Sequence, residues 1–118
     1  MSKKNKFNAG PIVLDVLGKT LTKDDIRRIA DPKTGGVILF GRNYESRAQL
    51  TALTTAIKKV RSDVMISIDH EGGRVQRCRT DGFTHLPAMK KLGDIWVNGG
   101  KKASAEHAFK AMEAATAV

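Results

Sequence analysis

Residues 35–40, Gly-Gly-Val-Ile-Leu-Phe, carry the sequence pattern that decides the fold. The apolar run from Val37 to Phe40 has no polar break, whereas a strand with one solvated face alternates apolar and polar residues. Turn-forming residues precede the run, at Asp31-Pro32 and at Gly35-Gly36. The stretch therefore predicts a strand that is buried on both faces, as in a parallel sheet.

Two similar apolar segments lie on either side of this strand in the sequence. Residues Ile12 to Val16 (IVLDV) are β-branched and apolar, and Val64 to Ile68 (VMISI) is again short and apolar. Each is bounded by polar or glycine-bearing segments. We therefore expect three strands, parallel and adjacent in chain order.

Helices are expected between these strands. Thr22 precedes the segment KDDIRRIA, and Asp25 follows three positions later as a near-capping box. Ser46 and Gln49 form an S-x-x-Q capping box. After it, four apolar residues fall on one helical stripe: Leu50, Leu53, Ile57 and Val60. The alternation predicts right-handed βαβ units, an α/β fold with a parallel sheet.

The segment after Pro87 has a weaker pattern. Gly99-Gly100 precedes an alanine-rich stretch that predicts a final helix from about Ala103 onward. Its expected face carries Phe109, Met112 and Thr116. No Gly, Asn or Pro caps this helix before Val118, so the sequence is expected to be cut rather than finished.

Residues 68–79, IDHEGGRVQRCR, form the segment richest in reactive side chains. Such loops follow the C-terminal ends of parallel strands, where active sites are built. Asp69 is a candidate to accept hydrogen bonds from ligand hydroxyls, with the alternative that it is an N-terminal cap or pairs with Arg74 or Arg77. Glu71 is expected to orient an arginine rather than act as a second acid/base carboxylate. Arg77 offers planar donors for vicinal hydroxyls, unless it is a solvated surface residue.

Other residues of this segment have plainer expected roles. Gly72-Gly73 predicts a tight turn with positive φ and matches no phosphate-binding motif. Cys78 with His70 or His85 lacks a recognised ligand or nucleophile spacing, so packing or surface roles are favoured. Arg42, Asn43 and Tyr44 make a smaller polar group after the second strand; Tyr44 either borders a ligand or packs over the rim.

The composition limits the class of protein. The net charge is +9, from 21 Lys and Arg against 12 Asp and Glu, but the excess is scattered in small pairs without interleaved aromatic residues. Nucleic acid is therefore not an expected partner. No segment approaches the roughly 20 apolar residues of a membrane span, and one cysteine fits a reducing compartment. We expect a cytoplasmic chain with a basic flexible tail over residues 1–9 and one domain over residues 10–118.

Four segments resemble, in order and spacing, the N-terminal region of the cytoplasmic peptidoglycan-recycling β-N-acetylglucosaminidases of glycoside hydrolase family 3. They are Gly10 to Val16, Gly35 to Phe40 with Arg42-Asn43-Tyr44, Asp69 to Arg77, and Gly82 to Pro87. The part EGGRVQR is highly specific. The resemblance implies a TIM (β/α)₈ barrel that removes terminal N-acetylglucosamine from cell-wall fragments through a glycosyl-aspartate, without metal or cofactor.

The resemblance also implies roles for individual residues. Asp69 and Arg77 correspond to positions that hold sugar hydroxyls. The supporting positions are Glu71, Gly72, Gly73 and Arg74. The family's Lys-His pair, acid/base histidine and aspartate nucleophile lie downstream, and none has a counterpart here, so no catalytic residue is assigned. His107, in a helical context, does not replace the acid/base histidine.

A closed barrel needs about 250 residues, so the chain is expected to hold only the first three or so βα units. The first hypothesis is therefore that the chain is an N-terminal fragment of a glycosidase and is inactive by itself. The alternative is a non-catalytic half-barrel module for carbohydrate binding or assembly. In it, two half barrels self-associate through exposed strand edges, or one binds a missing complementary half.

Overall fold

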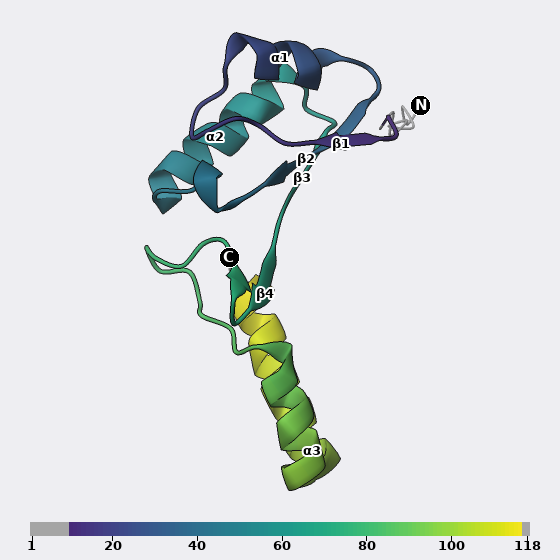
Figure 1. Cartoon of the computed structure of the whole chain (residues 1–118), viewed down its shortest axis with the longest axis vertical. Helices are drawn as coiled ribbons and strands as arrows, with labels where there is room; N and C mark the ends of the chain where they lie inside the picture. Colours follow the sequence, from purple (N-terminus) through teal and green to yellow (C-terminus); the bar gives the residue numbers. More distant parts are fainter. Residues whose placement is uncertain (1–9, 117–118) are drawn as a thin grey trace, which may run out of the picture. The chain divides into compact units, whose positions relative to one another are not determined.

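The computed structural model describes residues 10–116 (Figure 1), so the predicted tail of residues 1–9 lies outside the described residues. The contacts within the chain group it into two compact units. The first ends at Ile68 and the second begins at Asp69. Within residues 10–116, no helix is long and apolar enough to cross a bilayer.

The first unit contains a three-stranded parallel sheet. Its strands are β1 (Ile12–Leu14), β2 (Thr34–Leu39) and β3 (Met65–Ile68), in the spatial order β1-β2-β3. The prediction of three parallel strands, adjacent in chain order, is confirmed. β1 ends at Leu14 rather than Val16, and β2 ends at Leu39 rather than Phe40. β2 starts at Thr34 rather than Val37, because Thr34 already pairs with Ile12 of β1. The fold is therefore mixed α/β around a parallel sheet.

Two helices connect these strands, and their N-termini follow the predicted signals. Helix α1 (Lys23–Ala30) has a complete capping box: Asp25 N donates to Thr22 Oγ1 at 3.1 Å, and Thr22 N donates to Asp25 Oδ2 at 2.9 Å. Helix α2 (Arg47–Val60) has half of one, since Gln49 N donates to Ser46 Oγ at 3.1 Å. The Gln49 side chain instead accepts from Glu45 N at 2.9 Å, so it fixes the segment before the helix.

The hydrophobic core lies between this sheet and the two helices. Its buried residues are Val16, Ile29, Val37, Leu39, Leu53, Ile57 and Val64. Leu50 and Val60 pack against this cluster, so the predicted stripe of α2 is confirmed. The other face of the sheet is uncovered in this unit, because Val13 and Met65 are 59% and 58% exposed.

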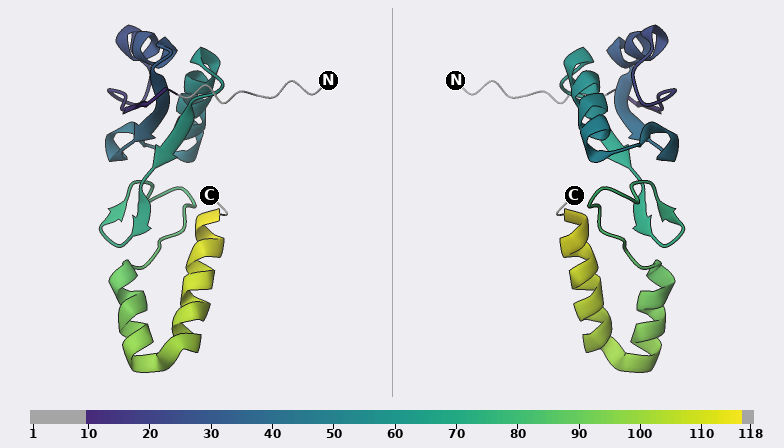
Figure 2. Two further views of the ribbon diagram at one scale, coloured as in Figure 1. Left: turned by 90° about the vertical axis from the view of Figure 1, so that its right-hand side faces the viewer. Right: turned by 90° about the vertical axis from the view of Figure 1, so that its left-hand side faces the viewer.

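The second unit begins with a two-stranded antiparallel hairpin of β4 (His70–Gly72) and β5 (Val75–Gln76), followed by an irregular loop. Helix α3 (Met89–Thr116) then contains a break at Gly100, where φ is 82° and ψ is 173°. The two arms of α3 lie side by side (Figure 2).

The prediction of one helix from about Ala103 was too short. The first arm, residues 89–99, was missed because Gly93 and the pair Gly99-Gly100 weaken the helical pattern. Phe109, placed on the expected helix face, is 62% exposed. The side chains of Met112 and Thr116 lie outside the part of the chain that the structure describes.

Candidate functional site

The segment singled out in the sequence begins where β3 ends. Ile68 pairs with Leu39 at the carboxyl end of the sheet, and Asp69 follows it directly. The chain then turns back within the β4–β5 hairpin at Gly72 and Gly73, whose φ values are 86° and 56°. The predicted turn with positive φ is confirmed. A Cβ at Gly72 would also lie 2.8 Å from the Leu86 Cβ, so glycine is required there both for conformation and for space.

The hairpin brings the two main candidate residues together. Arg77 Nη2 donates to Asp69 Oδ2 at 2.9 Å, and Arg77 N donates to Asp69 O at 3.2 Å. Both side chains keep about a third of their surface exposed, 32% for Asp69 and 31% for Arg77. One ion-pair bond uses only part of the acceptor capacity of a carboxylate, which has two oxygens. The pair is thus a preoriented group of acceptors and donors at the surface.

This ion pair is expected to contribute little to the stability of the fold. Pairs with this degree of solvent access typically contribute between 0 and about 1 kcal/mol, because water screens the charges and two side chains must be ordered. The hairpin backbone already joins the two residues. The arrangement is therefore better suited to holding a polar ligand than to holding the fold.

The supporting residues are placed differently. Glu71 is exposed, and the arginine partner expected for it is not found among the described residues. Arg74 is also exposed, and its carbonyl oxygen accepts a hydrogen bond from Arg79 Nη2 at 2.6 Å. Their side chains lie at the surface of the hairpin on either side of the glycine turn.

Gln76 is a residue that sequence reasoning missed. Its side chain is buried, and Nε2 donates to Cys78 O and Thr84 O, both at 3.0 Å. Its Oε1 accepts from Leu86 N, also at 3.0 Å. This one amide fastens residues 78–86 to the hairpin next to Arg77. The alternation of apolar Val75 and polar Gln76 in β5 could have drawn attention to this residue. Its hydrogen-bond partners, however, cannot be identified from the sequence.

The hairpin and the loop are joined by further hydrogen bonds. Gly73 N donates to Leu86 O at 2.9 Å, and His70 Nε2 lies 3.0 Å from Thr84 O. His85 Nε2 lies 2.7 Å from Arg79 O. Both imidazoles are therefore hydrogen-bonded to loop carbonyl oxygens. This agrees with the packing or surface roles that the sequence favoured for the two histidines.

Metal and thiol chemistry find no support in this segment. Cys78 is 2% exposed, which fits a packing role and restricts access to its sulfur. Among the residues that the structure describes, no group of three or more His, Cys, Asp and Glu side chains is placed to hold a metal ion.

The polar group after β2 is built into the first unit. Arg42 forms an ion pair with Asp15, which follows β1, and its guanidinium lies 5.0 Å from the centroid of the Phe40 ring. Asn43 is fully buried: Oδ1 accepts from Phe40 N at 2.8 Å, and Nδ2 donates to Val16 O at 3.1 Å. These contacts tie the loop after β1 to the loop after β2 at the carboxyl edge of the sheet.

Comparison with known proteins adds the family. Residues 12–116 match the model of the glycosyl hydrolase family 3 N terminal domain. The beta-hexosaminidase of Bordetella pertussis is 55% identical over 101 residues, covering 81% of this chain and 29% of the relative. The beta-hexosaminidase of Methylobacillus flagellatus is 58% identical over 95 residues, covering 80% of this chain and 27% of the relative.

A solved structure supports the same relationship. NagZ from Neisseria gonorrhoeae, in complex with N-trifluoroacetyl-D-glucosamine, matches with a TM-score of 0.75 and 45% identity. The match covers 81% of this chain and 28% of that protein. The chain spans less than a third of the length of these relatives. With 105 of its 118 residues matched by the family model, this chain belongs to glycosyl hydrolase family 3, in the part that forms the family's N-terminal domain.

Proposed function

We propose that this chain provides the sugar-holding N-terminal part of a cytoplasmic β-N-acetylglucosaminidase. The whole enzyme would remove terminal non-reducing N-acetylglucosamine from peptidoglycan fragments during cell-wall recycling. The observation that carries the proposal is the Asp69–Arg77 pair, held by the hairpin that follows β3 in a chain of this family. The sugar bound to the Neisseria relative is an N-acylated glucosamine, which supports this substrate class.

The proposed architecture is the first three or so βα units of a TIM barrel. The parallel order β1-β2-β3 and the helices between the strands support it. In such barrels ligands bind at the carboxyl ends of the strands. Asp69 follows Ile68 at that end of β3, so its position agrees with a substrate-binding role.

Each residue has a proposed role that follows from its chemistry. Asp69 accepts hydrogen bonds from sugar hydroxyls, and Arg77 both orients Asp69 and donates to a neighbouring hydroxyl. The turn at Gly72 and Gly73 reverses the chain between β4 and β5 and so brings Arg77 back beside Asp69. Glu71 and Arg74 support the hairpin from its surface.

Bond cleavage is assigned to residues that this chain does not supply. Retaining hydrolysis needs a nucleophile and an acid/base group about 5 Å apart on either side of the scissile bond. Asp69 is already paired with Arg77, and Glu71 is exposed two residues away. This arrangement supports the proposal that Asp69 holds the ligand and that Glu71 is a supporting residue. Proton transfer and a carboxylate nucleophile suffice for the reaction, so the proposal includes no metal or cofactor.

A second candidate function is an assembly module that pairs half barrels. The uncovered face of the sheet favours it, since Val13 and Met65 expose more than half of their surface, and β1 and β3 are the edges of this sheet. Unpaired strand edges promote association with another chain. Sedimentation over a wide concentration range distinguishes the two: a monomer at all concentrations contradicts the module, and a stable dimer supports it.

Turnover of a chromogenic N-acetylglucosaminide tests the first proposal. We expect no hydrolysis by the 118-residue chain, and hydrolysis after fusion to the C-terminal part of the Bordetella relative. In that fusion, Asp69→Ala should lower kcat/KM by about ten- to a hundredfold, because charge-assisted hydrogen bonds of about 1.5–3 kcal/mol are lost. Asp94→Ala is the control, since the Asp94 side chain forms its ion pair with exposed Lys90 on α3, away from the hairpin.

Two results would contradict the assigned roles. One is hydrolysis by the unextended chain that Asp69→Ala or Glu71→Ala abolishes, which would make these residues catalytic. The other is an equal fall in the kcat/KM of the fusion for Asp69→Ala and Asp94→Ala. Such a result would reject the proposed contact between Asp69 and the sugar.

A further inference from the structure

The Asp69–Arg77 pair lies at the open end of a very short hairpin. β4 has three residues and β5 has two. Asp69 stands directly before β4, and Arg77 directly after β5. An isolated two-stranded hairpin is only marginally stable in water. The bond from Arg77 N to Asp69 O, at 3.2 Å, is at the long limit of ordinary N–H···O hydrogen bonds. The backbone pairing of the hairpin is therefore a weak support for the pair.

The cross-strand register separates two faces of the hairpin. His70 pairs with Gln76, and both side chains reach the same carbonyl oxygen, Thr84 O, at 3.0 Å. Side chains alternate between the two faces of a strand, so the next cross-strand pair, Asp69 and Arg77, belongs to the opposite face. The ion pair between these two side chains agrees with that placement. One face of the hairpin is thus fastened to the loop, and the other presents a carboxylate and a guanidinium.

Gln76 is the buried connection between the hairpin and this loop. Its side chain is 2% exposed. It makes three hydrogen bonds of 3.0 Å, which join Nε2 to Cys78 O and Thr84 O, and Oε1 to Leu86 N. Because the amide group is planar and both of its N–H groups are used, these partners fix its orientation. Arg77 is the next residue along the chain, so the backbone at Arg77 is held from Gln76.

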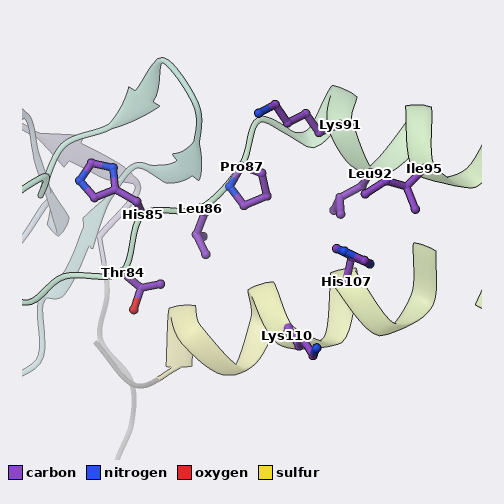
Figure 3. Close-up of a pocket in the computed structure, with 9 residues that line it drawn as sticks. All are labelled: Thr84, His85, Leu86, Pro87, Lys91, Leu92, Ile95, His107 and Lys110. Atoms are coloured by element: carbon purple, nitrogen blue, oxygen red, sulfur yellow. The ribbon is translucent and has the colours of Figure 1, made fainter. Parts of the chain in front are cut away.

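The loop has a looser contact with α3. The side chains of Thr84 and Leu86 line a cavity of about 350 Å³ together with residues of α3 (Figure 3). Side chains that border a void lack partner atoms there. The hydrogen bonds to Gln76 therefore define the position of the loop more closely than its contact with α3 does.

We propose that Gln76 is a positioning residue for sugar binding, and that it acts through Arg77. By fastening the end of β5 to the loop, its amide keeps the Arg77 guanidinium where it can hold Asp69 and donate to a sugar hydroxyl. This inference rests on the proposed function, and it assigns Gln76 no contact with the sugar itself. A displacement of about 1 Å can lower a rate by about a hundredfold, so a residue that only positions others can have a large effect.

Hydrogen exchange in the 118-residue chain tests the hold on Arg77 without any sugar. Gln76→Met keeps a side chain of similar length and removes all three hydrogen bonds. We expect exchange of the Arg77 amide to accelerate by about tenfold or more, together with that of the Leu86 amide.

Thr34→Val is the matched control for this experiment. The Thr34 side chain is also 2% exposed, and its hydroxyl donates to Arg28 O at the amino end of β2. The substitution therefore removes a hydrogen bond of a buried side chain at the edge of the sheet opposite to Asp69. Exchange of the Arg77 amide should change by less than about twofold.

The fusion with the C-terminal part of the Bordetella relative tests the role in sugar binding, with a chromogenic N-acetylglucosaminide as substrate. Gln76→Met should lower kcat/KM by about five- to fiftyfold, and Thr34→Val by less than about twofold. In a fusion that already carries Arg77→Ala, adding Gln76→Met should cost less than about threefold, because its effect passes through Arg77. A residue that only stabilises the fold would give the same loss with and without Arg77→Ala.

A milder variant covers the case in which Gln76→Met does not fold, which loss of amide dispersion would reveal. Gln76→Asn keeps the amide but shortens the side chain by one carbon, so it cannot keep all three hydrogen bonds at their present lengths. It should produce smaller changes in the same direction in both experiments, and these then decide the proposal.

The outcomes that overturn the proposal differ from those that overturn the proposed function. Faster exchange at Leu86 with unchanged exchange at Arg77 rejects the positioning role. So does a loss of kcat/KM from Gln76→Met that is absent, or that is equal with and without Arg77→Ala. If neither Asp69→Ala nor Arg77→Ala lowers kcat/KM, the proposed sugar contact fails, and the exchange at Arg77 alone decides whether Gln76 positions the pair.

Discussion

The two units of the chain are stabilised in different ways. In the first, seven buried apolar residues from the strands, helices and adjoining loops pack into one cluster. In the second, the hairpin and loop are joined by hydrogen bonds from one buried amide, Gln76, and from histidine side chains to backbone carbonyls. The hydrophobic effect is non-directional, whereas hydrogen bonds are directional and fix donor and acceptor positions. The second arrangement is thus suited to holding Asp69 and Arg77 in one geometry.

The largest expected effect is on the core of the first unit. Ile57→Ala removes buried atoms from a fully buried side chain and should lower the free energy of unfolding by about 2–5 kcal/mol. Met65→Ala is the control on the uncovered face of the same sheet, where the side chain is 58% exposed, and should cost less than about 1 kcal/mol. Urea denaturation measures both. Equal costs would show that the uncovered face is packed in solution.

A smaller and local effect is expected at Gln76. Gln76→Leu leaves the Leu86 N–H without its acceptor, a loss of about 1–3 kcal/mol for a buried donor. Hydrogen exchange at the Leu86 amide should therefore accelerate by about five- to 150-fold. Ile57→Ala should leave this exchange nearly unchanged if the two units open separately. The contrast between the units fails if both substitutions accelerate it alike.

Acid should weaken the first unit through Asp25. Burial of this carboxyl raises its pKa, but hydrogen bonds from Thr22 and Arg28 outweigh burial, and the net pKa lies below the usual 3.8. A lowered pKa stabilises the fold above the unfolded value, and this contribution is lost as pH falls through the folded value. Stability measured from about pH 6 to pH 3 should fall, and Asp25→Asn should flatten the fall. An unchanged slope would contradict the role of Asp25.

The smallest effect is expected on the surface of α3. Lys90 pairs with Asp94 at 3.0 Å, but the two side chains are 83% and 56% exposed. Lys90→Ala should change the free energy of unfolding by no more than about 0.5 kcal/mol. Denaturation at low and high salt tests this, and a salt-sensitive loss above 1 kcal/mol would mean that the arm is packed more closely than its exposure indicates.

The first unit could be predicted because each of its features has a short-range signal. Val37 to Leu39 is an apolar run, Thr22 and Asp25 stand at capping-box spacing, and Leu53 and Ile57 share a helical stripe. Each pattern reflects an interaction between residues a few positions apart. The strand order then followed from the short connections.

The second unit was predicted only in part because its contacts depend on partners that no local pattern specifies. The turn at Gly72-Gly73 was predicted, since two glycines favour positive φ. The sequence left two arginine partners open for Asp69, and the structure pairs it with Arg77. Gln76 binds carbonyls up to eight residues away, and the first arm of α3 carries glycines that weaken its helical signal. These features required the three-dimensional structure.

The order of the core residues along the chain matters for synthesis. All seven buried core residues, from Val16 to Val64, precede Asp69. Translation releases the N-terminal residues first, at about 5–20 residues per second. Once Ile68 has left the ribosomal exit tunnel, the nascent chain contains every side chain of this core. The parallel sheet can therefore assemble before the hairpin and α3 have fully emerged from the tunnel.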